Sequence, residues 1–250
     1  VRSRRQRQMC IRDRYETVQS ILAKSGHINH KYLKESESDK KAVIVVTANR
    51  GLAGGYNSNI TRMIIDEGFT KENTVVYAVG KKGRELLERK GYEIKADYSE
   101  AINDPIYKDA KEICDDVLSA FADGEVGEIY LAYTVFKNTV VHEPQLIRLL
   151  PVEADDAAHE TDGSEALMTY EPSEEEALDM IIPKYVCSLV YGALIESVAS
   201  ENGARMQAMD SATSNAEEMI SNLELAYNRA RQGAITQELT EIISGAEALK

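Results

Sequence analysis

The sequence predicts an α/β domain of three layers, built around a mainly parallel sheet and followed by one long helix. Two observations support this prediction. Between residues 42 and 150, apolar β-branched runs alternate with amphipathic helical segments, as in chains whose parallel sheets are covered by helices. After Pro183 no further proline occurs, and apolar or small residues recur at every third or fourth position, which is the spacing of a helix.

Composition and charge limit the possible functions. The 250 residues carry a net charge of −13, which argues against a general nucleic-acid binder. No apolar run in the sequence reaches the ~20 residues that a membrane span requires, so any membrane association is expected to be peripheral. Three unclustered cysteines, Cys10, Cys114 and Cys187, indicate a reducing compartment and neither a disulfide framework nor a metal site.

The first fourteen residues differ from the rest of the chain. They contain six arginines and one aspartate, and no apolar segment follows them as it would in a secretory signal. We interpret residues 1–14 as a non-native basic tail, with a functional basic arm or a transit peptide as the alternatives. Residues 15–26 then form a predicted amphipathic helix.

The central domain is expected to begin with a strand over residues 42–47. Its residues are apolar and β-branched almost without interruption, as in a strand that is buried on both faces. The glycine-containing turn at residues 50–55 and a helix over 56–66 follow. Strand, glycine turn and helix in this order are the opening of a βαβ unit.

The alternation continues through the domain. A second buried strand over 74–79 leads to a helix over 81–90, which ends at a glycine. A short third strand begins at Ile94. Asp104, followed by a proline, is expected to cap a helix that runs to about Phe121.

Two further segments complete the predicted sheet. A strand over 128–136 and a strand over 140–150 are joined by a turn that begins at Lys137 and Asn138. This pair is expected to be a hairpin at the edge of an otherwise parallel sheet. The predicted fold class is therefore α/β, a Rossmann-like three-layer domain with a mainly parallel sheet.

An acidic region separates this domain from the long helix. Residues 151–182 contain eleven acidic side chains and no lysine or arginine. The part near 153–166 is expected to be a flexible, solvated surface loop. The regular spacing of oxygen ligands in a calcium loop is missing from it. A short final strand is expected at Met168–Tyr170.

The long helix is expected to begin at Glu174. Ser173 and Glu176 have the spacing of a capping box, and Pro183 is expected to lie at a kink or a break. The predicted division of the chain is therefore 1–14, 15–172 and 173–250. Small residues that let another helix approach closely are Gly203, Ala204 and Ala208. Polar positions that can fix the register of a helix pair are Asn215, Asn222 and Asn228.

The chain offers no convincing catalytic centre. Gly51, Gly54 and Gly55 after a strand allow a nucleotide-binding interpretation, but they lack the spacing of the dinucleotide fingerprint and the Lys-Ser/Thr of a phosphate loop. Glycines at such a place more often permit a tight turn. The histidines show no metal-ligand spacing and no catalytic arrangement with serine or cysteine, so no cofactor or metal is expected. They are His27, His30, His142 and His159.

Two segments resemble the gamma subunit of the bacterial F-type ATP synthase. One covers residues 45–60 and reads VVTANRGLAGGYNSNI. The other covers residues 196–249, is highly specific, and reads ESVASENGARMQAMDSATSNAEEMISNLELAYNRARQGAITQELTEIISGAEAL. The resemblance extends over about residues 15–250.

The resemblance implies a rotor. In this family an α/β domain lies outside a ring of alternating alpha and beta subunits, and an antiparallel coiled coil of the N- and C-terminal helices enters the ring. The long C-terminal helix of this chain would be half of that coiled coil. The subunit performs no bond chemistry; its asymmetric shaft biases the conformations of the beta subunits and so couples proton flow to ATP synthesis. Family members begin with a further amphipathic helix, so the sequence is expected to be truncated at its N-terminus.

The resemblance also implies roles for individual residues. Positions that match contacts with loops of the beta subunits are Arg231, Gln232, Thr236 and Glu238. Ile242 and Ile243 match the shaft tip, in an apolar sleeve. Tyr170 and Glu171 match the foot, near the ring of c subunits and the epsilon subunit.

The resemblance likewise implies partners and a location. The partners are the alpha and beta subunits, the epsilon subunit and the c-subunit ring, without nucleic acid. The location is the cytoplasmic face of the bacterial cell membrane, as a peripheral part of the complex. The alternative hypothesis is a small α/β enzyme that binds a nucleotide at the turn of residues 51–55 and dimerises through its long helix.

Overall fold

The computed structural model describes residues 31–33, 38–152 and 174–249. The chain divides into two compact units, Val1–Arg205 and Met206–Lys250. The first unit contains a sheet with helices on both of its faces, and the second is helical. The helix α5 (Glu174–Ala248) contributes to both units.

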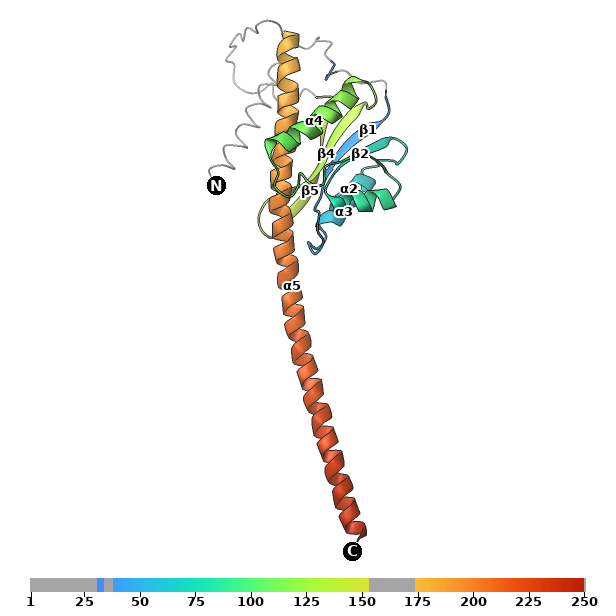
Figure 1. Ribbon diagram of the computed structural model, residues 1–250, viewed down its shortest axis with the longest axis vertical. Coiled ribbons are helices and arrows are strands. Elements are labelled where there is room, and N and C mark those ends of the chain that lie inside the picture. Colours follow the sequence, from blue (N-terminus) through green and yellow to red (C-terminus); the bar gives the residue numbers. More distant parts are fainter. Residues whose placement is uncertain (1–30, 34–37, 153–173, 250) are drawn as a thin grey trace. The chain divides into compact units, whose positions relative to one another are not determined.

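The first unit is built on one five-stranded sheet with the order β3-β2-β1-β4-β5 (Figure 1). β1 is parallel to β2 and β4, and β2 is parallel to β3, whereas β5 pairs antiparallel with β4 at the edge. The predicted fold class and the predicted antiparallel edge are therefore confirmed. The strands are β1 (Lys41–Val46), β2 (Thr74–Val79), β3 (Glu93–Asp97), β4 (Glu128–Phe136) and β5 (His142–Leu150).

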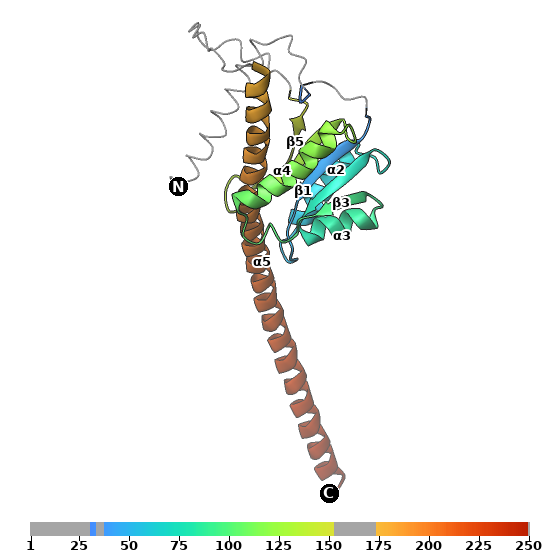
Figure 2. The same ribbon diagram turned by 45° about the horizontal axis from the view of Figure 1, so that its top comes forward.

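Alternate residues of the central strands face two separate cores. Ile44, Tyr77 and Leu131 point into a core formed with α4 (Tyr107–Ala122) and the first part of α5. Their neighbours point into a second core formed with α2 (Tyr56–Asp66) and α3 (Lys81–Arg89). The residues of that second core on the strands are Val43, Val45, Val76, Ala78 and Ala132. The sheet is thus the middle of three layers (Figure 2).

The link between β1 and α3 is closely packed. Thr47 Oγ1 accepts a hydrogen bond from Gly83 N at 2.9 Å and donates one to Gly80 O at 3.2 Å. A Cβ atom at Gly80, whose φ is +115°, would lie 2.1 Å from Thr47 O. The carbonyl of Ala48 and the side chain of Asn49 accept the next N–H groups of α3, at 3.0 Å each. The N-terminus of α3 is therefore capped by the segment that follows β1.

The boundaries of β1, α3 and β3 differ from the predictions by one residue, and those of α4 and β5 differ for a reason that side chains explain. α4 begins at Tyr107, so Asp104 is not its N-cap; Asp109 instead accepts a hydrogen bond from Ile106 N at 3.0 Å. β5 begins at His142 and not at residue 140. The reason is that the side chain of Asn138 accepts the N–H groups of both intervening valines, at 2.9 and 2.7 Å, and holds them in the turn.

α5 continues through Pro183 as one helix, so the expected break does not occur. A proline removes one helical hydrogen bond, but packing on both sides of it holds the helix in place. Leu178, Ile182 and Val190 are all fully buried in the core. By length and composition α5 also contains an 18-residue window apolar enough to cross a membrane, with mean hydropathy 1.5 and half of it buried in the fold.

Cys114 and Cys187 lie together in the core, although no motif in the sequence groups them. Both thiols are free and buried, the first on α4 and the second on α5. The hydrogen bond with Cys187, together with burial, raises the pKa of the Cys114 thiol. Both residues pack at the contact of α4 and α5.

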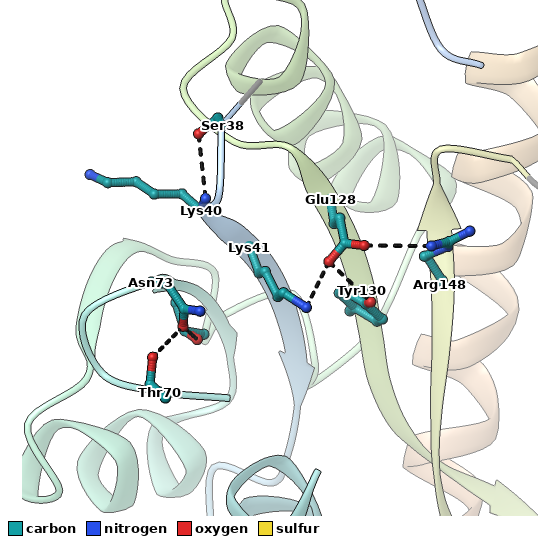
Figure 3. A network of polar contacts seen from close by, with 9 residues as sticks. Ser38, Lys40, Lys41, Thr70, Asn73, Glu128, Tyr130 and Arg148 are labelled. Carbon is teal, nitrogen blue, oxygen red and sulfur yellow. Dashed lines mark hydrogen bonds and ion pairs between the residues drawn. The ribbon is translucent and has the colours of Figure 1, made fainter. Parts of the chain in front are cut away.

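A polar network joins the amino-terminal ends of β1 and β4 to β5 (Figure 3). Glu128 forms ion pairs with Lys41 at 2.8 Å and with Arg148 at 3.5 Å, and it accepts a hydrogen bond from the Tyr130 hydroxyl at 3.2 Å. The ammonium group of Lys41 also lies 5.6 Å from the ring centres of Tyr130 and Phe69. Opposite charges thus fix the ends of three strands.

Several predictions fall outside the described residues. They are the basic tail 1–14, the helix at 15–26, the acidic loop near 153–166, the strand at Met168–Tyr170, and the residues Cys10, His27, His30, His159, Tyr170, Glu171 and Ser173.

Candidate functional site on the C-terminal helix

The second unit exposes an unusual amount of apolar surface. Every described side chain from Met209 to Leu249 is exposed. Soluble proteins rarely leave contiguous apolar patches of this kind open unless the patch binds a partner. The large apolar side chains in this unit are Met206, Met209, Met219, Ile220, Leu223, Leu225, Tyr227, Ile235, Leu239, Ile242, Ile243 and Leu249.

The first part of this surface has the spacing of a coiled coil. Small and apolar residues occur at two positions of a seven-residue repeat, which places them in one row along the helix. We call this row the first seam. Its members are Met209, Thr213, Ala216, Ile220, Leu223, Tyr227, Ala230 and Ala234.

A second row begins after the first one ends, and we call it the second seam. It has the same alternating spacing of four and three residues, but it does not continue the first repeat. On a straight helix of about 3.6 residues per turn, its centre lies roughly 90° around the axis from the first seam. A partner that covers the first seam therefore does not cover the second without changing sides. The members are Ile235, Leu239, Ile242, Ala246 and Leu249.

The residues assigned to beta-subunit contacts all lie on this exposed helix. Arg231 and Glu238 are seven residues apart, so they lie about 10 Å apart along the axis, on the side between the two seams. Thr236 Oγ1 donates to Gln232 O at 2.9 Å, which binds these two residues into one turn of the helix. The tip residues Ile242 and Ile243 are 68% and 63% exposed. Their contacts with a partner stay predictions.

The glycine turn was the other candidate site, and α5 packs directly against it. In a sheet of this topology, ligands bind at the carboxyl ends of the strands where the strand order reverses, here between β1 and β4. The buried hydroxyl of Tyr56 donates to Ser197 O at 3.1 Å, and Arg205 Nη2 lies 3.5 Å from Gly51 O. Ala204 packs on the same turn. The geometry therefore does not favour the nucleotide-binding alternative.

The turn itself has the conformation that its glycines permit. Gly54 has a φ of +55°, in the left-handed region, and Leu52 shares it with a φ of +61°. Burial raises the pKa of the Tyr56 hydroxyl that follows the turn. The structural role expected for these glycines agrees with this geometry.

The small residues of α5 serve a different contact from the one predicted. Gly203 does not admit another helix: a Cβ atom there would lie 2.6 Å from His142 Cε1 of β5. Ala204 contacts the turn after β1. Both residues are small because the sheet and its loops approach the helix closely at this level.

Sequence reasoning missed the polar contacts at this level. Ser200 Oγ donates to Thr134 O of β4 at 3.1 Å, next to the contact of Tyr56 with Ser197. These residues lie far apart in sequence and follow no motif, so only the fold brings them together. Among the residues that the structure describes, no group of three or more His, Cys, Asp or Glu side chains could hold a metal ion.

Comparisons with known proteins point to one family. A family model described as ATP synthase matches residues 2–249. The ATP synthase gamma chain of Lachnoclostridium phytofermentans is 63% identical over 241 residues, which cover 94% of this chain and 83% of that relative. A gamma chain named sodium ion specific, from Acetobacterium woodii, is 42% identical over 250 residues, with the same coverage of 94% and 83%.

Solved structures share the fold at low sequence identity. A chain of the Euglena gracilis mitochondrial ATP synthase, in an assembly of OSCP, F1 and c-ring, matches with a TM-score of 0.64 and 17% identity. The match covers 99% of this chain and 90% of that one. A chain from the central stalk and c-ring of the Tetrahymena thermophila enzyme gives a TM-score of 0.58 at 22% identity, with coverage of 84% and 94%.

Proposed function

The chain belongs to the ATP synthase family as a gamma subunit of the bacterial F type, and on this basis we propose how its helix serves that complex. The chain is the rotor-shaft subunit, which couples ion flow to ATP synthesis by rotation. The observation that carries the proposal is the exposed apolar surface of α5, because a shaft must be covered by the subunits around it.

We propose that α5 acts without any chemistry of its own. Its two seams lie on different sides of one helix, so each subunit of a surrounding ring meets a different surface at each angle of rotation. If α5 binds two conformations of a beta subunit with different free energies, the difference shifts the populations of these conformations. Rotation of α5 thereby changes the nucleotide affinities of the beta subunits in turn.

We propose that different parts of the chain contact different partner subunits. Arg231, Gln232, Thr236 and Glu238 contact beta-subunit loops, and Ile242 and Ile243 lie in the apolar sleeve formed by the alpha and beta subunits. Tyr170 and Glu171 contact the epsilon subunit and the c-subunit ring at the foot. The helix 173–250 is proposed to be half of an antiparallel coiled coil. The complex places the chain at the cytoplasmic face of the membrane, without direct insertion.

The coupling ion is proposed to be the proton. The relative from Acetobacterium woodii is named sodium ion specific, so the experiments below measure ATP-driven transport of both ions.

The proposed beta-subunit contacts are tested with Arg231→Ala combined with Glu238→Ala. The assembled complex is reconstituted into vesicles, and ATP-driven ion uptake is measured. The double variant is expected to lower uptake roughly threefold, the factor equivalent to one exposed charge contact. The matched control is Arg62→Ala with Asp66→Ala, which removes one charge of each sign from the exposed side of α2. Unchanged uptake with unchanged assembly would count against these contacts.

A further inference from the structure

The contact between α5 and the carboxyl end of the sheet has a distinct polar character. From Leu178 to Leu194 the buried face of α5 is mainly apolar, and its buried Ser188 donates within the helix, to Lys184 O at 2.7 Å. From Ser197 to Arg205 the contacts include hydrogen bonds to Tyr56, Thr134 and Gly51, beside the close steric contacts of Gly203 and Ala204. We call this stretch with its partners the α5 seat, formed by Ser197, Ser200, Gly203, Ala204 and Arg205 against Tyr56, Thr134, His142 and Gly51.

The seat contacts α5 on two sides of the helix, one facing β5 and the other facing the turn after β1. Gly203 meets His142 of β5, whereas Arg205 reaches Gly51 in the turn after β1. On a helix of about 3.6 residues per turn, the arc from Gly203 to Arg205 that contains Ser200 and Ser197 spans roughly 200°. Rotation of α5 about its own axis would displace Ser200 from Thr134 O, displace Ser197 O from the Tyr56 hydroxyl, and alter the close approach of Gly203 to His142.

The seat also occupies the last turns of α5 within the first unit. That unit ends at Arg205, and the helix continues from Met206 without interruption. A twisting force on the α/β domain therefore reaches the rest of α5 through these contacts and through the buried apolar face that precedes them.

We propose that Tyr56 and Ser200 are positioning residues that lock the rotational setting of α5 on the α/β domain. The inference rests on the proposed rotor function and deepens it. Without the lock, α5 slips to neighbouring settings under load, and part of the ATP hydrolysed is not converted into ion transport. The hydrogen bonds are suited to this role because their strength depends on angle as well as distance.

The test compares Tyr56→Phe with Tyr92→Phe in the assembled, vesicle-reconstituted complex. Both substitutions remove one buried tyrosine hydroxyl, but Tyr92 donates to Phe69 O at 2.7 Å inside the α/β domain and does not touch α5. Ion uptake per ATP hydrolysed is measured together with the thermal midpoint of each complex. Tyr56→Phe is expected to raise the uncoupled fraction of hydrolysis about fivefold, the factor equivalent to one hydrogen bond, while Tyr92→Phe leaves it unchanged at a similar midpoint.

Ser200→Ala provides the second variant and is expected to act like Tyr56→Phe. Equal uncoupling in Tyr92→Phe and in both seat variants would overturn the inference, because loss of stability alone would then explain the effect. No uncoupling in either seat variant would overturn it as well. Failure of the wild-type chain to support ATP-driven uptake at all would instead contradict the proposed function.

Discussion

At the scale of single residues, Glu128 shows how a half-buried charge is kept ionised. Burial alone would raise the pKa of Glu128, but the hydrogen bond and charge of Lys41 outweigh it and lower the pKa below its usual value of 4.5. In the same pair, the hydrogen bond to Glu128 raises the pKa of Lys41 above 10.5. Each group therefore holds its partner in the charged form over the whole neutral range.

This pair predicts how stability depends on pH. A lowered carboxyl pKa gives stability that is complete above pH 4.5 and is lost as the pH falls through the lowered value. The raised pKa of Lys41 gives stability that is complete below pH 10.5 and is lost as the pH rises through the raised value. Glu128→Gln is therefore expected to lower the free energy of unfolding at pH 7 by about 1 kcal/mol after screening by solvent.

Thermal unfolding at a series of pH values measures this effect. The difference between wild type and Glu128→Gln should shrink as the solution is made more acidic than pH 4.5. Glu72→Gln, on an exposed turn, is the control and should match wild type throughout. A difference that persists undiminished in acid would show that the substitution acts through packing and not through charge.

Residue contacts divide into those the sequence reveals and those it does not. Gly54 could be assigned to a turn because glycine adopts a positive φ at little cost and is therefore common in tight turns. The contact of Tyr56 with Ser197 could not be assigned, because 141 residues separate the two and neither belongs to a motif. Gly203 was assigned to the wrong neighbour for the same reason: a small residue indicates a close approach but does not identify what approaches.

At the scale of elements, strands and helices were predictable where buried apolar residues recur at the regular spacing of a strand or a helix. β2 and α2 begin and end at the predicted residues, because β2 is an unbroken buried run and α2 has its buried residues at helical spacing. α4 and β5 begin later than predicted because side chains of Asp109 and Asn138 capture local N–H groups. Such local competition changes boundaries without changing the element.

Two glycines in helices are expected to respond oppositely to the same substitution. Gly83 lies at the start of α3, where a Cβ atom would come within 2.5 Å of Thr47 Oγ1. Gly83→Ala should therefore destabilise the chain by about 2 kcal/mol through overpacking. Gly233 in α5 has no neighbour within 4 Å, so Gly233→Ala should raise helix stability by about 1 kcal/mol.

Thermal unfolding measures the first effect and circular dichroism of the chain the second. Gly245→Ala serves as a further comparison, since it also has open space around it. A stabilising Gly83→Ala would mean that α3 can move away from β1 at little cost, and the proposed tight link would be wrong.

At the scale of the whole molecule, the two units differ in what stabilises them. The first unit buries two cores on either side of a sheet. In the second unit the described side chains beyond Met209 are all exposed, so the helix depends on its own hydrogen bonds. Helices without tertiary packing are only marginally stable in water.

Hydrogen exchange should separate the two units. In the isolated chain, amides of residues 206–248 are expected to exchange much faster than those of β1 and β4. In the assembled complex, the same amides should become protected as partners cover the two seams. Slow exchange of residues 206–248 in dilute isolated chain would contradict the view that the helix requires partners.

The close packing of Thr47 with Gly80 and Gly83 limits which substitutions these positions can accept as the sequence diverges. Neither Gly80 nor Gly83 can accept even a methyl group unless Thr47 or α3 moves. Both positions must therefore remain glycine as long as Thr47 and α3 keep their places. A descendant chain that keeps this link must keep a pair of glycines three residues apart after its second strand. That spacing is a mark by which distant copies of the fold can be sought in sequence alone, even where the long helix has diverged.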